Sequence, residues 1–200
     1  EGLSNIHSIT QESDAVMVAR GDLGIETSLA DLPNVQRRIM YACSKWGVRS
    51  IVATHLLESM IEKPTPTRAE VTDVANAVYE EVDAVMLSGE TTVGKHPIRC
   101  VQLMDRVARR IERSGGLGYG KEATLRTEKQ KVIQAACGLA DSIPHALLAV
   151  FTRSGLTAHQ AALLRPRSPI FAFTPQSSFC RAVFISSAAR IHMSLSLIHI

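Results

Sequence analysis

The chain has 200 residues, a formal net charge of +3 and 46% hydrophobic residues. This composition is typical of a globular protein with a buried core and excludes a disordered chain. The small charge, with no run of Lys and Arg, argues against a nucleic-acid partner, and no apolar run reaches the ~18 residues that a membrane-spanning helix needs.

The cysteines indicate a reducing compartment. Cys43, Cys100, Cys137 and Cys180 lie far apart and form no CxxC pair, so zinc ribbons and redox motifs are disfavoured. Because no basic and then apolar leader begins the chain, we expect reduced thiols in a cytoplasmic protein. Both ends look cut, and we interpret residues 194–200, which carry no cap or turn signal, as a non-native tail.

Three short apolar runs, residues 15–19, 51–53 and 84–87, each end in polar residues. Continuous apolar runs of this length are typical of strands buried on both faces of a parallel sheet. They recur about every 30 to 35 residues, the length of a βα unit. The sequence therefore predicts an α/β fold, either doubly wound or a (β/α)₈ barrel, and spacing alone does not separate the two.

Helical patterns lie between and after these runs. Residues 35–46 share one apolar face, and Gly47 is the expected stop. A second helix is predicted over 71–78, because Thr67 and Glu70 match the capping box. A third follows Pro97, which suits a first-turn position.

A glycine-rich stretch at residues 114–120 is predicted to be a linker. Beyond it the pattern predicts a helix, a strand, a helix and a strand over residues 132–140, 147–152, 157–164 and 169–174. We accordingly predict one domain over residues 1–117 and a second, smaller α/β domain over 118–193.

Polar residues at the carboxyl ends of the predicted strands are the candidate site, since ligands of α/β sheets bind there. Asp22 could hold Mg²⁺, which prefers carboxylate oxygens. An ordinary alternative stays open, in which acidic residues such as Asp22 and Glu90 cap the following helices. The candidates in the first domain are Arg20, Gly21, Asp22, Thr54, His55, Ser88 and Glu90.

Four sequence blocks around these residues resemble the pyruvate kinase family. They are residues 16–26, residues 53–61 with the adjoining 63–70, residues 73–78 and residues 86–91. The resemblance covers about residues 1–190. It implies a partial (β/α)₈ TIM barrel, formed by the last three βα units, followed by a truncated C-terminal α/β domain.

The resemblance also implies an activity and assigns roles. The family transfers the phosphoryl group of phosphoenolpyruvate to ADP in glycolysis, giving pyruvate and ATP, with Mg²⁺ and K⁺. Asp22 matches the magnesium ligand, and the N–H groups of Gly21 and Asp22 would hold the substrate carboxylate. Thr54 matches a threonine near the substrate's methylene carbon, Ser88 and Glu90 match residues near a proton relay, and Arg68 matches an arginine at a subunit contact of the homotetramer.

This sequence also departs from the family. His55 stands where many members carry Gln or Asn. The catalytic lysine, a second magnesium-binding glutamate, the lid domain and the potassium ligands have no counterpart in these residues. We therefore expect a fragment that is inactive alone.

The second domain offers a separate candidate. Residues 152–157 join a strand to a helix, with hydroxyls, a glycine and N–H groups that could cradle a phosphate. They resemble the family's effector loop for sugar phosphates, although an ordinary βα turn explains them equally well. The residues concerned are Thr152, Arg153, Ser154, Gly155 and Thr157.

Two other functions stay open at this level. A metal-dependent lyase of the aldolase type also carries a Gly-Asp-Leu turn after a strand, as residues 21–23 do here. A regulatory module that binds a sugar phosphate would need only the second domain. The blocks at residues 67–70 and 87–90 favour the phosphotransferase.

Overall fold

The computed structural model describes residues 2–174, which fall into two compact units that divide after Glu122. The predicted tail at residues 194–200 lies outside the described residues, as does the last part of the predicted second domain. No helix among residues 2–174 is long and apolar enough to cross a membrane.

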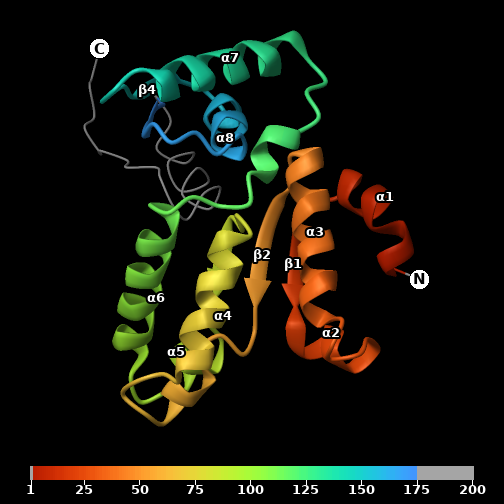
Figure 1. Cartoon of the computed structure of the whole chain (residues 1–200), viewed down its shortest axis with the longest axis vertical. Coiled ribbons are helices and arrows are strands. Elements are labelled where there is room, and N and C mark those ends of the chain that lie inside the picture. The colour runs from red at the N-terminus through yellow and green to blue at the C-terminus, as the bar shows by residue number, and fades with distance from the viewer. Residues whose placement is uncertain (1, 175–200) are drawn as a thin grey trace. The chain divides into compact units, whose positions relative to one another are not determined.

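The first unit contains a parallel sheet of three strands in the order β1-β2-β3. Figure 1 shows β1 and β2 side by side. The strands are β1 (Ala15–Ala19), β2 (Arg49–Ala53) and β3 (Ala84–Met86), which confirms the three predicted strands and their parallel arrangement. Met17 lies beside Ile51, and Ile51 lies beside Ala84. This register places the carboxyl ends of all three strands at one edge of the sheet.

Helices connect the strands, as the periodicity predicts. The longest are α3 (Leu32–Trp46) before β2, α4 (Arg68–Tyr79) before β3 and α6 (Pro97–Glu112) after it. The shorter elements are η1 (Gly2–Asn5), α1 (Ile6–Gln11), α2 (Arg20–Glu26), η2 (Glu58–Ile61), α5 (Gly89–Thr92) and η3 (Tyr119–Glu122).

Local signals in the sequence set the ends of these helices. Gly47 ends α3 with φ of 69°, a left-handed conformation that costs glycine little. Thr67 begins α4 with a complete capping box, in which the Thr67 hydroxyl accepts from the Glu70 N–H and the Glu70 carboxylate accepts from the Thr67 N–H. Pro97 stands in the first turn of α6.

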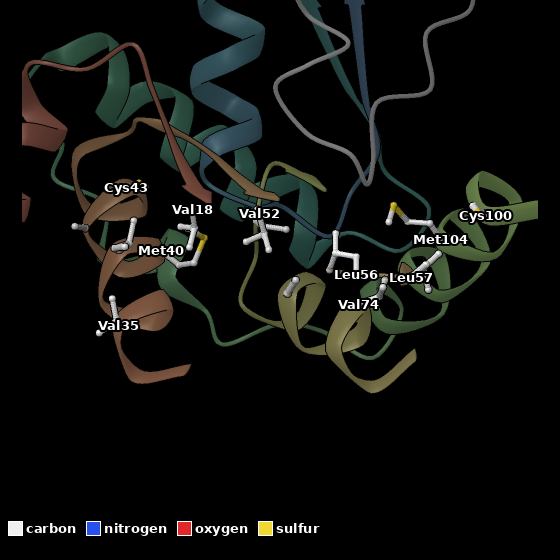
Figure 2. Close-up of a cluster of buried hydrophobic side chains, with 14 of the residues drawn as sticks. Val18, Val35, Met40, Cys43, Val52, Leu56, Leu57, Val74, Cys100 and Met104 are labelled. Carbon is white, nitrogen blue, oxygen red and sulfur yellow. The ribbon is translucent and has the colours of Figure 1, made fainter. Parts of the chain in front are cut away.

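The core of the first unit lies between the sheet and its helices (Figure 2). Val18 and Val52 are almost fully buried and contribute to it with Met40, Leu56 and Val74. Val18 and Val52 alternate along their strands with residues that point to the opposite face. There Met17 and Met86 are 52% and 37% exposed, whereas Ala53 is fully buried, so the expected burial on both faces holds only in part for the described residues.

The second unit contains α7 (Glu128–Ser142), β4 (Leu148–Phe151), α8 (Leu156–Leu163) and β5 (Ile170–Phe173). Strands β4 and β5 pair in parallel, and Ile133, Cys137 and Ile170 form the centre of a small core. All four predicted elements are present, and each ends within about two residues of its predicted last residue. Helix α7, however, begins four residues before its predicted start. A capping box at Thr127 explains this early start.

The glycine-rich stretch does not behave as a free linker. The Glu81 carboxylate accepts from the N–H of Gly118 at 2.9 Å and of Gly120 at 3.3 Å, and the Leu117 N–H donates to the Tyr79 carbonyl. These bonds attach the stretch to the first unit. The first unit consequently extends to Glu122, where the sequence predicted a boundary after residue 117.

Candidate active site

The polar residues that follow the three strands meet at one edge of the sheet in the first unit. Arg20, Gly21 and Asp22 begin α2 directly after β1, and Thr54 and His55 follow β2. Ser88 is the N-cap of α5 after β3. The parallel register thus brings together the residues that the sequence singled out.

Gly21 and Thr54 are in direct contact. The Gly21 N–H donates to Thr54 Oγ1 at 3.1 Å. A Cβ added at Gly21 would lie 3.2 Å from His55 Nε2 and 3.8 Å from Thr54 Oγ1, closer than ordinary packing allows for the first contact. An alanine at this position would require the exposed His55 ring to shift by a few tenths of an ångström.

The loop after β2 has a strained backbone. Thr54 has φ of 69° and His55 has φ of 53°, both in the left-handed region. A β-branched residue rarely adopts this conformation, which costs about 1–3 kcal/mol per residue and persists only where the surroundings enforce it. The loop is consequently held by contacts outside itself.

Arg20 supplies those contacts. Its Nη2 donates to the carbonyl of Thr54 at 2.6 Å and to that of His55 at 3.2 Å, and its Nε donates to Thr54 at 3.3 Å. Nη1 forms an ion pair with Asp73 Oδ1 at 2.6 Å. The Arg20 side chain is 10% exposed, so the charge-assisted bonds form in a region largely shielded from water.

Glu90 connects the loops after β2 and β3. Its side chain is buried, and one oxygen accepts from the Leu57 N–H at 3.0 Å while the other accepts from the Ser88 N–H at 2.8 Å. The carboxylate is thus occupied by backbone amides. This geometry gives Glu90 a positioning role toward Ser88, where the resemblance alone placed it near a proton relay.

Asp22 is exposed in the first turn of α2. The N-cap residue of this helix is Ala19, which offers no side-chain cap. One of the two amides predicted to hold a substrate carboxylate, that of Gly21, is already bonded to Thr54. The Asp22 N–H belongs to the first turn, where N–H groups have no intrahelical acceptor.

The donor set for a cation is small. Among residues 2–174, no group of three His, Cys, Asp or Glu residues could together hold a metal ion. Asp22 can supply one hard oxygen ligand, which fits Mg²⁺, since this ion commonly takes one or two carboxylates and completes its shell with water and phosphate.

A second network holds the segment between β2 and α4. The Glu70 carboxylate accepts from the N–H and hydroxyl of Ser59, at 2.7 and 2.5 Å, besides its capping-box bonds to Thr67. Burial raises the pKa of Glu70, but the hydrogen bonds from Ser59 and Thr67 outweigh it and leave the pKa below its ordinary value. Arg68 is exposed at the start of the same helix.

The cysteines carry no reactive signature. Cys43, Cys100 and Cys137 are buried free thiols, and Cys180 lies outside the described residues. Burial raises the pKa of Cys43 to about 12 and that of Cys137 to about 11. These thiols stay protonated near neutral pH, as the expectation of inert reduced cysteines requires.

The candidate effector loop of the second unit is built mainly by its backbone. Thr152 is buried, and its N–H donates to the Phe173 carbonyl at 2.9 Å. Gly155 is the N-cap of α8 with φ of 78°, whereas Arg153 and Ser154 are exposed. The exposed groups face solvent at the start of an eight-residue helix.

Sequence families match both units of this structure. Residues 1–101 match the model of the pyruvate kinase barrel domain, and residues 130–193 match that of the pyruvate kinase alpha/beta domain. The first match alone spans half of the chain.

The chain belongs to the pyruvate kinase family.

Individual family members support this assignment. The chain is 42% identical to the pyruvate kinase of Methanocaldococcus jannaschii over 88% of the chain and 39% of the relative. It is 38% identical to pyruvate kinase 2 of Synechocystis sp. over 90% of the chain and 31% of the relative. The crystal structure of a pyruvate kinase from Cryptosporidium parvum superposes with a TM-score of 0.88 at 34% identity, covering 99% of the chain and 41% of that structure.

The chain spans well under half the length of these pyruvate kinases. The three-stranded sheet of the first unit is therefore part of the pyruvate kinase barrel, and the second unit is part of its α/β domain. This confirms the fold predicted from the resemblance. The matches favour pyruvate kinase over the metal-dependent lyase and the separate regulatory module.

Two contributions at this edge were not predicted from the pyruvate kinase motifs. Asp73 anchors Arg20, and Ser59 anchors Glu70. Ser59 lies in the sequence block at residues 53–61 and Asp73 in the block at residues 73–78, so the sequence already placed both near the site. It did not identify their bonding partners, because each bond joins residues on different elements.

Proposed function

We propose that the full-length protein containing this chain is a cytoplasmic pyruvate kinase of glycolysis, transferring the phosphoryl group of phosphoenolpyruvate to ADP. One observation carries the proposal. In a chain of this family, Asp22 and the bonded pair of Gly21 and Thr54 meet at the carboxyl edge of the barrel sheet. Ligands of parallel sheets bind at this edge.

Asp22 would hold the divalent cation through its exposed carboxylate. When bound, such a cation would provide positive charge near the substrate oxygens, where negative charge develops on the enolate. The first turn of α2, with the Asp22 N–H, adds a dipole that favours an anionic group. Phosphoryl transfer depends on such positioning and charge stabilisation more than on covalent chemistry.

Thr54 would serve the later protonation at carbon. Its Oγ1 accepts from the Gly21 N–H, and its hydroxyl hydrogen has no acceptor among residues 2–174. The hydroxyl can therefore donate to substrate or to a water molecule. Ser88, positioned by Glu90 at its own N–H, is the second hydroxyl at this edge and a candidate for the same relay.

Other parts of the enzyme complete the proposed site. The catalytic lysine, the second carboxylate ligand and the potassium site would come from parts of a full-length pyruvate kinase beyond these 200 residues. Arg68, exposed at the start of α4, is proposed to contact a neighbouring subunit in a homotetramer. The loop of Thr152, Arg153, Ser154, Gly155 and Thr157 is proposed to bind a sugar-phosphate effector.

The test is an assay of ATP formation by the full-length protein from phosphoenolpyruvate and ADP in the presence of Mg²⁺. We expect Asp22→Ala to lower kcat about 10³-fold, since charge stabilisation in the transition state is lost. Asp14→Ala is the matched control, because Asp14 is exposed in a bend of the same unit, just before β1. An inactive wild-type protein, or an Asp22→Ala variant with normal turnover and magnesium dependence, would overturn the proposal.

A further inference from the structure

The backbone at Thr54 and His55 requires an external restraint. Both residues have positive φ, at 69° and 53°, and neither is a glycine. A threonine adopts this conformation only where surrounding contacts exclude its ordinary extended or helical alternatives. The residue that provides the restraint therefore determines where the Thr54 hydroxyl lies.

The guanidinium of Arg20 meets this requirement. It donates to both carbonyls of the strained pair, at 2.6 Å for Thr54 and 3.2 Å for His55. A planar guanidinium presents several donors in a fixed fork, so it can fix the directions of two successive carbonyls at once. A lysine ammonium has no such fork and cannot reproduce this pattern of bonds.

Asp73 fixes Arg20 in turn. Arg20 extends from the end of β1, and its Nη1 bonds to the Asp73 carboxylate on α4 at 2.6 Å. The Asp73 side chain is 34% exposed, whereas that of Arg20 is 10% exposed. The ion pair leaves the remaining donors of the guanidinium directed at the loop after β2.

The restraint reaches the proposed substrate contact through one hydrogen bond. With the Thr54 backbone fixed, Oγ1 lies where the Gly21 N–H donates to it at 3.1 Å. One lone pair of Oγ1 is thereby used, and the hydroxyl hydrogen is left to donate. Arg20 itself makes its bonds to protein groups, so it acts on the reaction through Thr54.

We propose that Arg20 is a positioning residue, which holds the left-handed pair of Thr54 and His55 so that the Thr54 hydroxyl meets substrate in one orientation. The proposal rests on the proposed function for its effect on turnover. Its structural half, the dependence of the Thr54 conformation on Arg20, is independent of that function.

The experiment compares Arg20→Lys, Asp73→Asn and Arg109→Lys in the full-length protein. Arg20→Lys keeps the charge but loses the fork. We expect kcat to fall about 10- to 100-fold, as a displacement of about 1 Å would cause, with KM changed less than about threefold. Asp73→Asn keeps an oxygen acceptor for Nη1, so we expect a smaller loss, up to about tenfold.

Arg109→Lys is the matched control. Arg109 pairs with Asp105 on the exposed side of α6, and we expect kcat within about twofold of the wild type. Melting curves of each variant separate loss of folding from loss of positioning. A crystal structure of Arg20→Lys reads the φ angle of Thr54 directly and is expected to show it outside the left-handed region.

Each outcome decides one question. Unchanged kcat with an unchanged Thr54 φ in Arg20→Lys would overturn the positioning role. A raised KM with normal kcat would also overturn it, because that result indicates direct substrate binding by Arg20. A wild-type protein without phosphotransferase activity would refute the proposed function, while the Thr54 φ in the variant structure would still test Arg20.

Discussion

The loops that follow the strands are held differently in the two units. In the first unit, side chains from other elements fix the loop backbones, as Arg20 does at Thr54 and Glu90 does at Leu57 and Ser88. In the second unit, the loop after β4 is held by a bond from the Thr152 N–H to the Phe173 carbonyl, by the left-handed Gly155 and by a long bond, at 3.5 Å, from the Thr174 hydroxyl to the Arg153 carbonyl. The side chains of Arg153 and Ser154 remain exposed.

The difference indicates two kinds of site. Buried carboxylate and guanidinium groups that satisfy backbone atoms give a loop with one geometry, as a catalytic site requires. A loop whose exposed side chains make few bonds to other elements can adapt to a ligand that orders it. We therefore expect the strand ends of the first unit to be preformed and those of the second to respond to binding.

The largest effect is expected when the 200-residue chain, which carries the preformed loops, is assayed without the rest of the enzyme. The 200-residue chain spans 31–39% of the length of two related pyruvate kinases. We expect no ATP formation from phosphoenolpyruvate and ADP by this chain, since catalytic groups that act as a unit fail together. Turnover above background by the purified chain would show that the rest of the enzyme is dispensable.

The next largest effect is expected at the close approach of two loops. Gly21→Ala would place a Cβ 3.2 Å from His55 Nε2, so the His55 ring must shift, and we expect kcat of the full-length protein to fall up to about tenfold. Gly138→Ala on α7 is the control. Its added Cβ would meet no atom within 4 Å, so we expect unchanged kcat and about 0.5–1 kcal/mol more stability. Equal behaviour of the two variants in a steady-state assay would refute the claim.

Each unit contains a carboxylate that accepts from two backbone N–H groups, and we expect the buried one in the first unit to contribute more to stability. Each carboxylate oxygen of Glu90 accepts from one backbone N–H, and Glu90→Gln replaces one of these oxygens with an NH₂ donor. We expect the free energy of unfolding to fall by about 2–3 kcal/mol. Asp141, exposed in the second unit, accepts from the N–H of Arg167 and Ser168, and Asp141→Asn should cost about 1 kcal/mol. Urea unfolding of both variants gives the comparison, and a larger loss for Asp141→Asn would contradict it.

The smallest effect is a dependence on pH. The pKa of Glu70 is lowered in the folded protein, so the stability that its bonds contribute is present above the ordinary value of 4.5 and is lost as the pH falls through the folded pKa. The difference in unfolding free energy between wild type and Glu70→Gln should accordingly shrink from about pH 7 to about pH 3.5. A difference that stays constant or grows on acidification would show that the Glu70 bonds do not depend on its charge.

Much of the fold follows from local sequence, and much of the site does not. β1 was predicted at its observed bounds, and the capping box at Thr67 was visible in the sequence, because both depend on neighbouring residues. The left-handed backbone at Thr54 and His55 runs against the local preference of both residues. Its carbonyls bond to Arg20, which lies 34 positions from Thr54 along the chain and pairs with Asp73, 19 positions from Thr54.

The same contrast explains the outcome at the glycine-rich stretch. Its composition is that of a linker, and the boundary was predicted after residue 117. The structure instead bonds Gly118 and Gly120 to Glu81, a residue with φ of 61° at the end of α4. Together with the Leu117–Tyr79 backbone bond and the ring contact of Tyr119 with Tyr41, these bonds attach the stretch to the first unit.

Amide hydrogen exchange of the full-length protein without substrate tests the difference between the two kinds of loop most directly. The Gly21, Leu57 and Ser88 N–H groups donate to side chains, whereas the Arg153 and Ser154 N–H groups have no acceptor among residues 2–174. We expect the first group to exchange at least about 100-fold more slowly than an unfolded chain and the second to exchange within about tenfold of it. Similar rates in the two groups would contradict a preformed site in the first unit.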